Sequence, residues 1–184
     1  GGENTAIGRD SLKLNTTADN NTAVGFSALA ANTTGHSNVS LGAYSMTANT
    51  QSNRNTALGY NTLSSHNLTS DSNGYNTCVG FQAGSDITTG TQNTFIGGLA
   101  GDTTTTAANN TAVGYNAFTA NTTGATNTAI GGSAMGANTT GGTNVAVGQN
   151  ALSSNTTASN NVAVGYDALG ASTTATGSTA VGRF

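Results

Sequence analysis

A glycine preceded by an aliphatic residue recurs along the whole chain at a nearly constant spacing. Consecutive copies stand 17 residues apart, except for one interval of 21 residues between Gly59 and Gly80. A fixed period of this length is typical of proteins built from stacked structural repeats. The spacing therefore constrains the fold more than any other feature, and each repeat unit is numbered here from its glycine as position 0. The glycines are Gly8, Gly25, Gly42, Gly59, Gly80, Gly97, Gly114, Gly131, Gly148, Gly165 and Gly182.

The residues just before each glycine predict a short β-strand. Position −3 is always Thr or Val and position −1 is always aliphatic, so the two form a pair with the two-residue period of a strand. Position −2 is mostly Ala, which indicates that something packs closely against the other face of the strand. A helical hairpin is disfavoured, because glycine recurs inside each unit and apolar residues do not recur at helical spacing. The residues at position −1 are Ile7, Val24, Leu41, Leu58, Val79, Ile96, Val113, Ile130, Val147, Val164 and Val181.

The rest of each unit predicts a second short extended piece and then a polar loop. Position +4 usually carries a large apolar residue, and the Asn-Thr-Thr-Gly segment of residues 121–124 and its relatives is rich in residues that favour turns. We expect these loops to face outward. In two neighbouring units position +4 is glycine, and we expect Phe95, Ile87 and Leu99 to fill the space beside Gly84 and Gly101.

A short strand cannot bury its faces alone, whereas stacked identical coils can pair with the copies on either side. The sequence therefore predicts an all-β fold, a parallel β-solenoid of 17-residue coils that spans residues 1–184 as a single domain. Ten intervals at the strand spacing of a sheet give a rod about 48 Å long. Asn recurs at position −4 in ten units, which predicts a structural ladder of stacked amides along the rod axis.

The composition excludes several classes of protein. Charged residues make up only 6% of the chain and the net charge is −3, so the chain has no basic surface for nucleic acid. The sequence has no apolar run long enough to span a membrane. The chain begins and ends inside repeat units, so we expect it to be a piece of a longer fibre.

Catalytic and metal-binding patterns are missing from the sequence. The seven acidic residues are spread over the units without a recurring pair, and the single cysteine, Cys78, occupies a position that is Ala in most units. We therefore expect Cys78 to be a small buried residue, and we expect the two histidines, His36 and His66, to be solvated in polar loops. These features predict that the chain is not an enzyme and binds no cofactor or metal ion.

The interval between Gly59 and Gly80 is the one break in the rhythm. Its four extra residues must leave the stack as a bulge somewhere within residues 64–75. In repeat proteins, insertions map to loops on one face, which is often the binding face. We therefore consider His66, Asp71 and Tyr75 to form a candidate contact loop, with a neutral loop expansion as the alternative.

Two further patterns concern the polar loops. Several loops begin an Asn-x-Ser/Thr sequon, which would be glycosylated in a host with the necessary machinery. The adjacent threonines of the loops stack into an array, which leaves an ice-binding solenoid as an alternative function, although these threonines are adjacent in a turn and do not alternate along a flat strand. The sequon asparagines are Asn15, Asn20, Asn32, Asn67, Asn109, Asn121, Asn138 and Asn155.

The unit Asn-Thr-Ala-Val-Gly-Tyr, as in residues 110–115, resembles the head repeat of YadA-type trimeric autotransporter adhesins and the similar arrays of bacteriophage tail-fibre proteins. The likeness covers nearly the whole chain, but the 17-residue period is a few residues longer than the typical adhesin unit. The resemblance implies a left-handed β-roll in a parallel homotrimer. It also implies that the aliphatic residues at position −1 face the threefold axis and supply trimer or core packing.

The expected function is that of a structural and adhesive segment of a trimeric fibre. Such a segment would be extracellular, on a bacterial cell surface or a phage virion. Its partners would be two further copies of itself and possible contacts with a host surface receptor or glycan. A self-assembling extracellular filament subunit is the main alternative.

Overall fold

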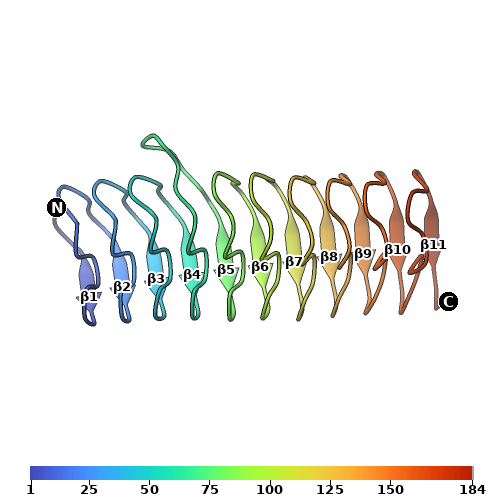
Figure 1. The fold of residues 1–184 in the computed structure, drawn as a ribbon, viewed down its shortest axis with the longest axis horizontal. Helices are drawn as coiled ribbons and strands as arrows, with labels where there is room; N and C mark the ends of the chain where they lie inside the picture. The colour runs from blue at the N-terminus through green and yellow to red at the C-terminus, as the bar shows by residue number, and fades with distance from the viewer. Residues whose placement is uncertain (184) are drawn as a thin grey trace.

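The structure is a computed structural model that describes residues 1–183, and it is a straight rod of stacked coils (Figure 1). Each coil contributes one three-residue strand to a single parallel sheet, in which the eleven strands follow one another in chain order. The predicted all-β parallel solenoid with 17-residue coils is thereby confirmed. The strands are β1 (Thr5–Ile7), β2 (Thr22–Val24), β3 (Val39–Leu41), β4 (Thr56–Leu58), β5 (Thr77–Val79), β6 (Thr94–Ile96), β7 (Thr111–Val113), β8 (Thr128–Ile130), β9 (Val145–Val147), β10 (Val162–Val164) and β11 (Thr179–Val181).

The register of the sheet places equivalent positions of neighbouring units side by side. Ala112 pairs with Ala129, and Val113 pairs with Ile130, as the 17-residue period requires. The glycine at position 0 then turns the chain where it lies close to the next coil. Gly114 has φ of +137°, and a Cβ there would come within 2.7 Å of the backbone of Gly131. Only glycine fits such a corner, which explains why it is the most constant residue of the unit.

The core is a narrow column inside the coils, lined by positions −2, +3 and +4. In the coil of β7 these are Ala112, Ala117 and Phe118, and all three are fully buried. Small residues at positions −2 and +3 leave room for one large side chain per coil, which keeps the interior filled. The alanines at position −2 predicted close packing against this face of the strand. The residues that pack there are those at positions +3 and +4, on the other side of the coil.

The aliphatic residues at position −1 lie outside this core. None of the eleven, from Ile7 to Val181, is buried in the single chain, and Leu41 is 46% exposed. Core packing within one chain was therefore the wrong role for them, because the strand alternation that buries position −2 turns positions −3 and −1 outward. Their role in a trimer stays a prediction.

The second extended piece of each unit is a set of turns and not a strand. Positions +2 and +4 adopt left-handed backbone conformations, as at Asn116 (φ +54°) and Phe118 (φ +59°). These conformations break the strand geometry, yet alternate N–H groups still donate to the next coil, as Phe118 N does to Ala134 O at 2.9 Å. The coil is thus closed by left-handed corners, which amino-acid propensities did not indicate.

The asparagines at position −4 form the predicted ladder. The side-chain oxygen of Asn110 accepts hydrogen bonds from the backbone N (2.9 Å) and Nδ2 (3.2 Å) of Asn127. Nδ2 of Asn110 donates to Asn93 Oδ1 (3.2 Å) and to the carbonyl of Gly124 (3.0 Å). Asn110 is only 1% exposed, so the ladder is an interior network with nearly every group paired.

A second asparagine ladder, at position +7, was missed from the sequence. Asn121, Asn138 and Asn155 are fully buried, and Nδ2 of Asn138 donates to Asn121 Oδ1 at 3.0 Å. Asn121 also donates to the carbonyl of Gly124, the same acceptor that Asn110 uses, so the two ladders meet at one backbone group in each such coil. The asparagine that opens the Asn-Thr-Thr-Gly segment is therefore interior, and only the threonines that follow it face outward.

Phe95 fills the space beside the two glycines at position +4, as predicted. Its ring lies against Gly101, where a Cβ would come within 2.5 Å of Cδ2, and it also flanks Gly84 at 3.3 Å. Ile87 packs against Gly84 and is fully buried, whereas Leu99 is half-buried and stays outside the core. Cys78 is fully buried, which confirms its expected place and raises the pKa of its thiol to about 12 through desolvation.

Candidate interaction surfaces

The insertion leaves the stack as a bulge at residues 68–72, the green loop that rises between β4 and β5 (Figure 1). The coil keeps the 17-residue register as far as Asn67, whose Oδ1 accepts from Thr50 N at 3.1 Å. The register has shifted to 21 residues by Asn76, which donates to Asn55 Oδ1 at 3.1 Å. The predicted location of the extra residues is confirmed.

The bulge folds back onto the two preceding coils through polar contacts. Asp71 Oδ1 accepts from Asn53 Nδ2 at 2.6 Å and lies 4.0 Å from Nε2 of His36. Arg54 Nη1 donates to Asn73 Oδ1 at 2.7 Å and lies 3.4 Å from the hydroxyl of Tyr75. We call this set the bulge cluster: His36, Asn53, Arg54, Asp71, Asn73 and Tyr75.

The bulge cluster includes two of the three predicted contact residues and four residues that were missed. Asp71 and Tyr75 are exposed, as a contact surface requires. Three of the missed residues belong to earlier coils: His36, Asn53 and Arg54. Numbering each unit from its glycine could have indicated two of them, because His36 and Asn53 both occupy position −6 and therefore stack on each other. Stacking brings together in space what lies 17 or more residues apart in sequence.

His66 is not part of the contact loop, and the expectation that it is solvated was wrong. It occupies position +7, where its neighbours along the axis are Asn49 in one coil and Ile87 in the next, and it is fully buried. Neither ring nitrogen has a hydrogen-bond partner within the described residues. Burial lowers the pKa of His66 to about 4, an effect that the nearby backbone of Thr88 partly opposes.

This burial predicts that acid destabilises the rod through His66. The folded state favours the neutral ring. Protonation of His66 therefore takes nothing from the free energy of unfolding above the unfolded pKa of 6.5, and this free energy falls as the pH drops from 6.5 towards 4. The full loss is about 3 kcal/mol. We expect urea unfolding to show a smaller drop between pH 7.5 and pH 4.5 in His66→Asn, which returns the ladder residue, than in the parent. His36→Asn, at a partly exposed site, is the matched control, and equal drops in all three proteins would contradict the prediction.

The outer face of the sheet is an unbroken, uncharged surface. Positions −3 and −1 supply only Thr, Val, Ile and Leu over all eleven strands. Ile130 is 40% exposed and Val113 is half-buried, so the side chains of this face are only partly covered in the single chain. Monomeric soluble proteins rarely expose apolar patches of more than a few hundred Å², and larger ones mark interaction sites.

Aromatic side chains form a second exposed row beyond the glycine corner. Phe26 and Tyr44 meet edge to face at 5.1 Å between centroids, Tyr44 and Tyr60 at 5.8 Å, and Tyr60 stacks on Phe81 at 5.6 Å. Arg9 lies 5.6 Å from the Phe26 ring and extends the row at one end. The rings contact one another along the axis, so this row is a partly exposed packing rim, and its contacts stabilise the stack.

Glycosylation of the folded chain is restricted by the second ladder. Four of the eight sequon asparagines, namely Asn32, Asn121, Asn138 and Asn155, are fully buried with their amides hydrogen-bonded inside the coil. Asn20 and Asn109 are exposed. The expected column of modified loops is therefore contradicted at the buried sites, because a buried amide cannot carry a glycan without unfolding the coil.

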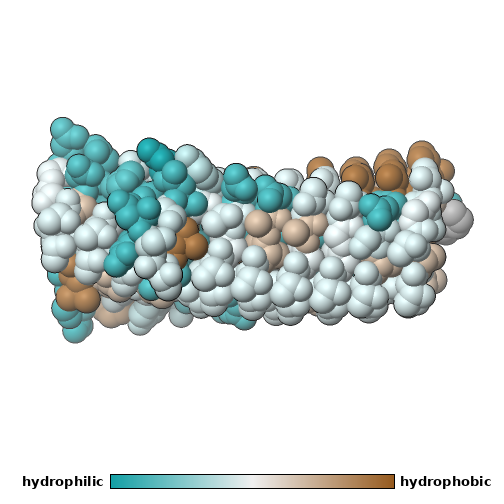
Figure 2. All heavy atoms as spheres, turned by 90° about the horizontal axis from the view of Figure 1, so that it is seen from above, coloured by the Kyte–Doolittle hydropathy of each residue, from teal (hydrophilic) through white to brown (hydrophobic). Residues whose placement is uncertain are grey.

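The surface seen from the side of the bulge is mostly polar or of neutral hydropathy (Figure 2). The strongly hydrophilic residues gather over the half of the rod that carries the bulge, and apolar residues lie along one edge near the other end.

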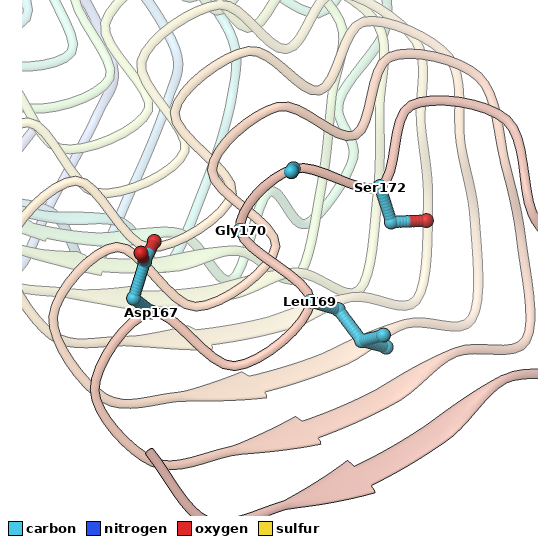
Figure 3. A pocket seen from close by; sticks show the side chains of 5 residues that line it. Asp167, Leu169, Gly170 and Ser172 are labelled. Atoms are coloured by element: carbon cyan, nitrogen blue, oxygen red, sulfur yellow. The ribbon is translucent and has the colours of Figure 1, made fainter. Parts of the chain in front are cut away.

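A pocket of about 250 Å³ lies at the last coil, lined by Asp167 and residues 169–172 (Figure 3). It opens where Leu169 is only partly covered, whereas Leu152 one coil earlier is fully buried. The pocket is thus the uncovered end of the core column.

Within residues 1–183 no group of three or more His, Cys, Asp or Glu side chains is placed to hold a metal ion. The same residues contain no helix that is long and apolar enough to cross a membrane. Comparisons with protein families, with curated proteins and with solved structures found no match to this chain.

Proposed function

We propose that the chain is a rod segment of a homotrimeric extracellular fibre, which holds a binding region away from its base. The observation that carries the proposal is the uncharged face formed by positions −3 and −1 along the whole rod, in which position −1 is always aliphatic and position −3 is Thr or Val. A face of this kind suits a second and a third copy of the same chain, because equal coils present equal faces at equal heights.

The thin core of the single chain supports this assignment. Each coil buries about one large side chain, such as Leu152 or Phe118, beside two alanines. Association would add the partly exposed side chains of position −1, each of which gains about 1.5 to 3 kcal/mol on full burial. The stripe runs through all eleven strands, so the gain would be distributed along the whole rod.

The remaining surfaces suit an extracellular fibre of a bacterial cell or a phage virion. The loops on the other sides carry mostly Thr, Asn, Ser and Gly, and charged residues make up 6% of the chain. Such loops offer water many hydrogen bonds, and the exposed apolar area outside the sheet face includes the row of aromatic side chains. These features favour a structural and adhesive role over catalysis.

A charge in the stripe is expected to break the trimer. Val113→Asp places a carboxylate in the uncharged face at the middle of the rod, three times per trimer, and close like charges cost several kcal/mol. We expect association to weaken on the order of 100-fold or more. Sedimentation equilibrium at micromolar concentration measures this directly. Thr123→Asp, on the exposed loop of the same coil, is the matched control and should remain trimeric. A monomeric mass for the parent chain would overturn the proposal.

A further inference from the structure

The bulge cluster gathers polar chemistry of several kinds at one exposed place. It combines the guanidinium of Arg54, the carboxylate of Asp71, the imidazole of His36 and the ring of Tyr75. The side chain of Asp71 is 71% exposed and Tyr75 is 50% exposed. Asp71 is joined to the preceding coils through Asn53 and lies near His36, and Asn73 is joined to Arg54.

Part of the hydrogen-bonding capacity of the cluster is unused. Within the described part of the chain, Asp71 bonds through Oδ1 and Arg54 bonds through Nη1, while Asp71 Oδ2, Arg54 Nη2 and Asn73 Nδ2 make no side-chain hydrogen bond. The cluster therefore offers one strong acceptor and several donors to solvent. The partly exposed ring of Tyr75 lies beside Arg54, whose Cζ is 6.0 Å from the ring centroid.

We propose that the bulge cluster binds a neutral saccharide through two vicinal hydroxyl groups. A hydroxyl both donates and accepts, so a vicinal pair satisfies the carboxylate oxygen of Asp71 and the donors of Asn73 and Arg54 together. The C–H face of a sugar ring is apolar and packs against an exposed aromatic ring such as that of Tyr75. Arg54 and Asp71 cancel in charge, so the cluster has no net attraction for an ionic ligand.

Asp71 and Tyr75 are open to solvent, and a single copy of such a site binds weakly. The one pocket described above lies at the last coil, away from the bulge. The strength of binding by the fibre rests on the proposed trimer, since three chains in parallel present three bulges at one height. Linked weak sites gain avidity without any new contact.

Saturation-transfer difference NMR on the full chain tests the proposal. The probes are soluble oligomers of mannose, galactose, glucose and N-acetylglucosamine, with sialylated oligosaccharides as the charged comparison. We expect transfer to at least one neutral oligomer, and an at least fivefold loss of signal in Asp71→Ala, in Tyr75→Ala and in a variant that deletes residues 69–72 to restore the 17-residue spacing. Asp86→Ala, an exposed carboxylate on the next coil, is the matched control and should bind as the parent does.

Each other outcome overturns the proposal. A folded, trimeric parent that shows no transfer to any neutral oligomer refutes the saccharide site and leaves the rod function standing. Transfer to the sialylated probes alone refutes the neutral ligand. Transfer that survives deletion of the bulge places binding elsewhere on the rod. Sedimentation of the same samples decides the trimer separately, so the failure of one proposal is distinguishable from the failure of the other.

Discussion

Gly101→Leu is expected to destabilise the rod severely, although leucine is the usual residue at this position in other units. Leu152 occupies the equivalent site with φ of +51°, close to the +58° of Gly101, so the backbone accepts leucine there. The obstacle is Phe95, because a Cβ on Gly101 would come within 2.5 Å of its Cδ2 and 2.7 Å of its Cζ. Overpacking a core typically costs about 1 to 3 kcal/mol, and a whole leucine side chain at this contact should exceed that range.

The second change that completes this test is Phe95→Ala. Alone it leaves a cavity beside two glycines and should cost about 3 to 5 kcal/mol. Combined with Gly101→Leu it recreates the Ala and Leu pair of other coils, such as Ala146 with Leu152, and we expect most of the loss to be recovered. Urea unfolding followed by circular dichroism gives the double-mutant cycle. Additive losses in the double variant would show that Phe95 and Gly101 are not coupled.

Asn110→Asp is expected to be the most damaging conservative change in the ladder. Aspartate keeps the oxygen that accepts from Asn127 but replaces Nδ2, which donates to Asn93 Oδ1 and to the carbonyl of Gly124. The carboxylate would then face two acceptors in a site that is 1% exposed in the parent. An uncompensated buried charge of this kind costs about 3 to 5 kcal/mol.

The loss should depend on pH with a defined sign. The site favours the protonated carboxyl, which raises the pKa of this aspartate above its unfolded value of about 3.9. The extra destabilisation is therefore absent below that value and grows as the pH rises above it. We expect the deficit of Asn110→Asp in urea unfolding to be larger at pH 7 than at pH 4. Asn109→Asp changes the exposed neighbour and should show little deficit at either pH; equal deficits in the two variants would contradict a buried ladder.

At the bulge, the repeat numbering predicted the place of the insertion but not the position of every polar side chain near it. The count of residues between Gly59 and Gly80 located the insertion, and Asp71 on the bulge and Tyr75 just after it proved to be exposed. His66 did not join them. It follows the 17-residue register into the second ladder, so its burial was decided by the column it occupies and not by the polar residues around it in sequence.

The sequence by itself determined the period, the strands, the ladder at position −4 and the way in which Phe95 compensates for Gly84 and Gly101. These features depend on residues that recur at a fixed offset, and stacking converts a recurring residue into a column whatever the path of the coil.

Only the tertiary structure decided which face of each strand is inside. Alternation shows that Ala112 and Val113 point to opposite sides, and the side that closes on itself is chosen by left-handed corners such as Asn116 and Phe118. Those corners wrap the chain around the small residue, so the alanine column becomes the core and the valine column becomes the outer face. They also turn position +7 inward, which makes Asn121 a rung of a second ladder and buries His66.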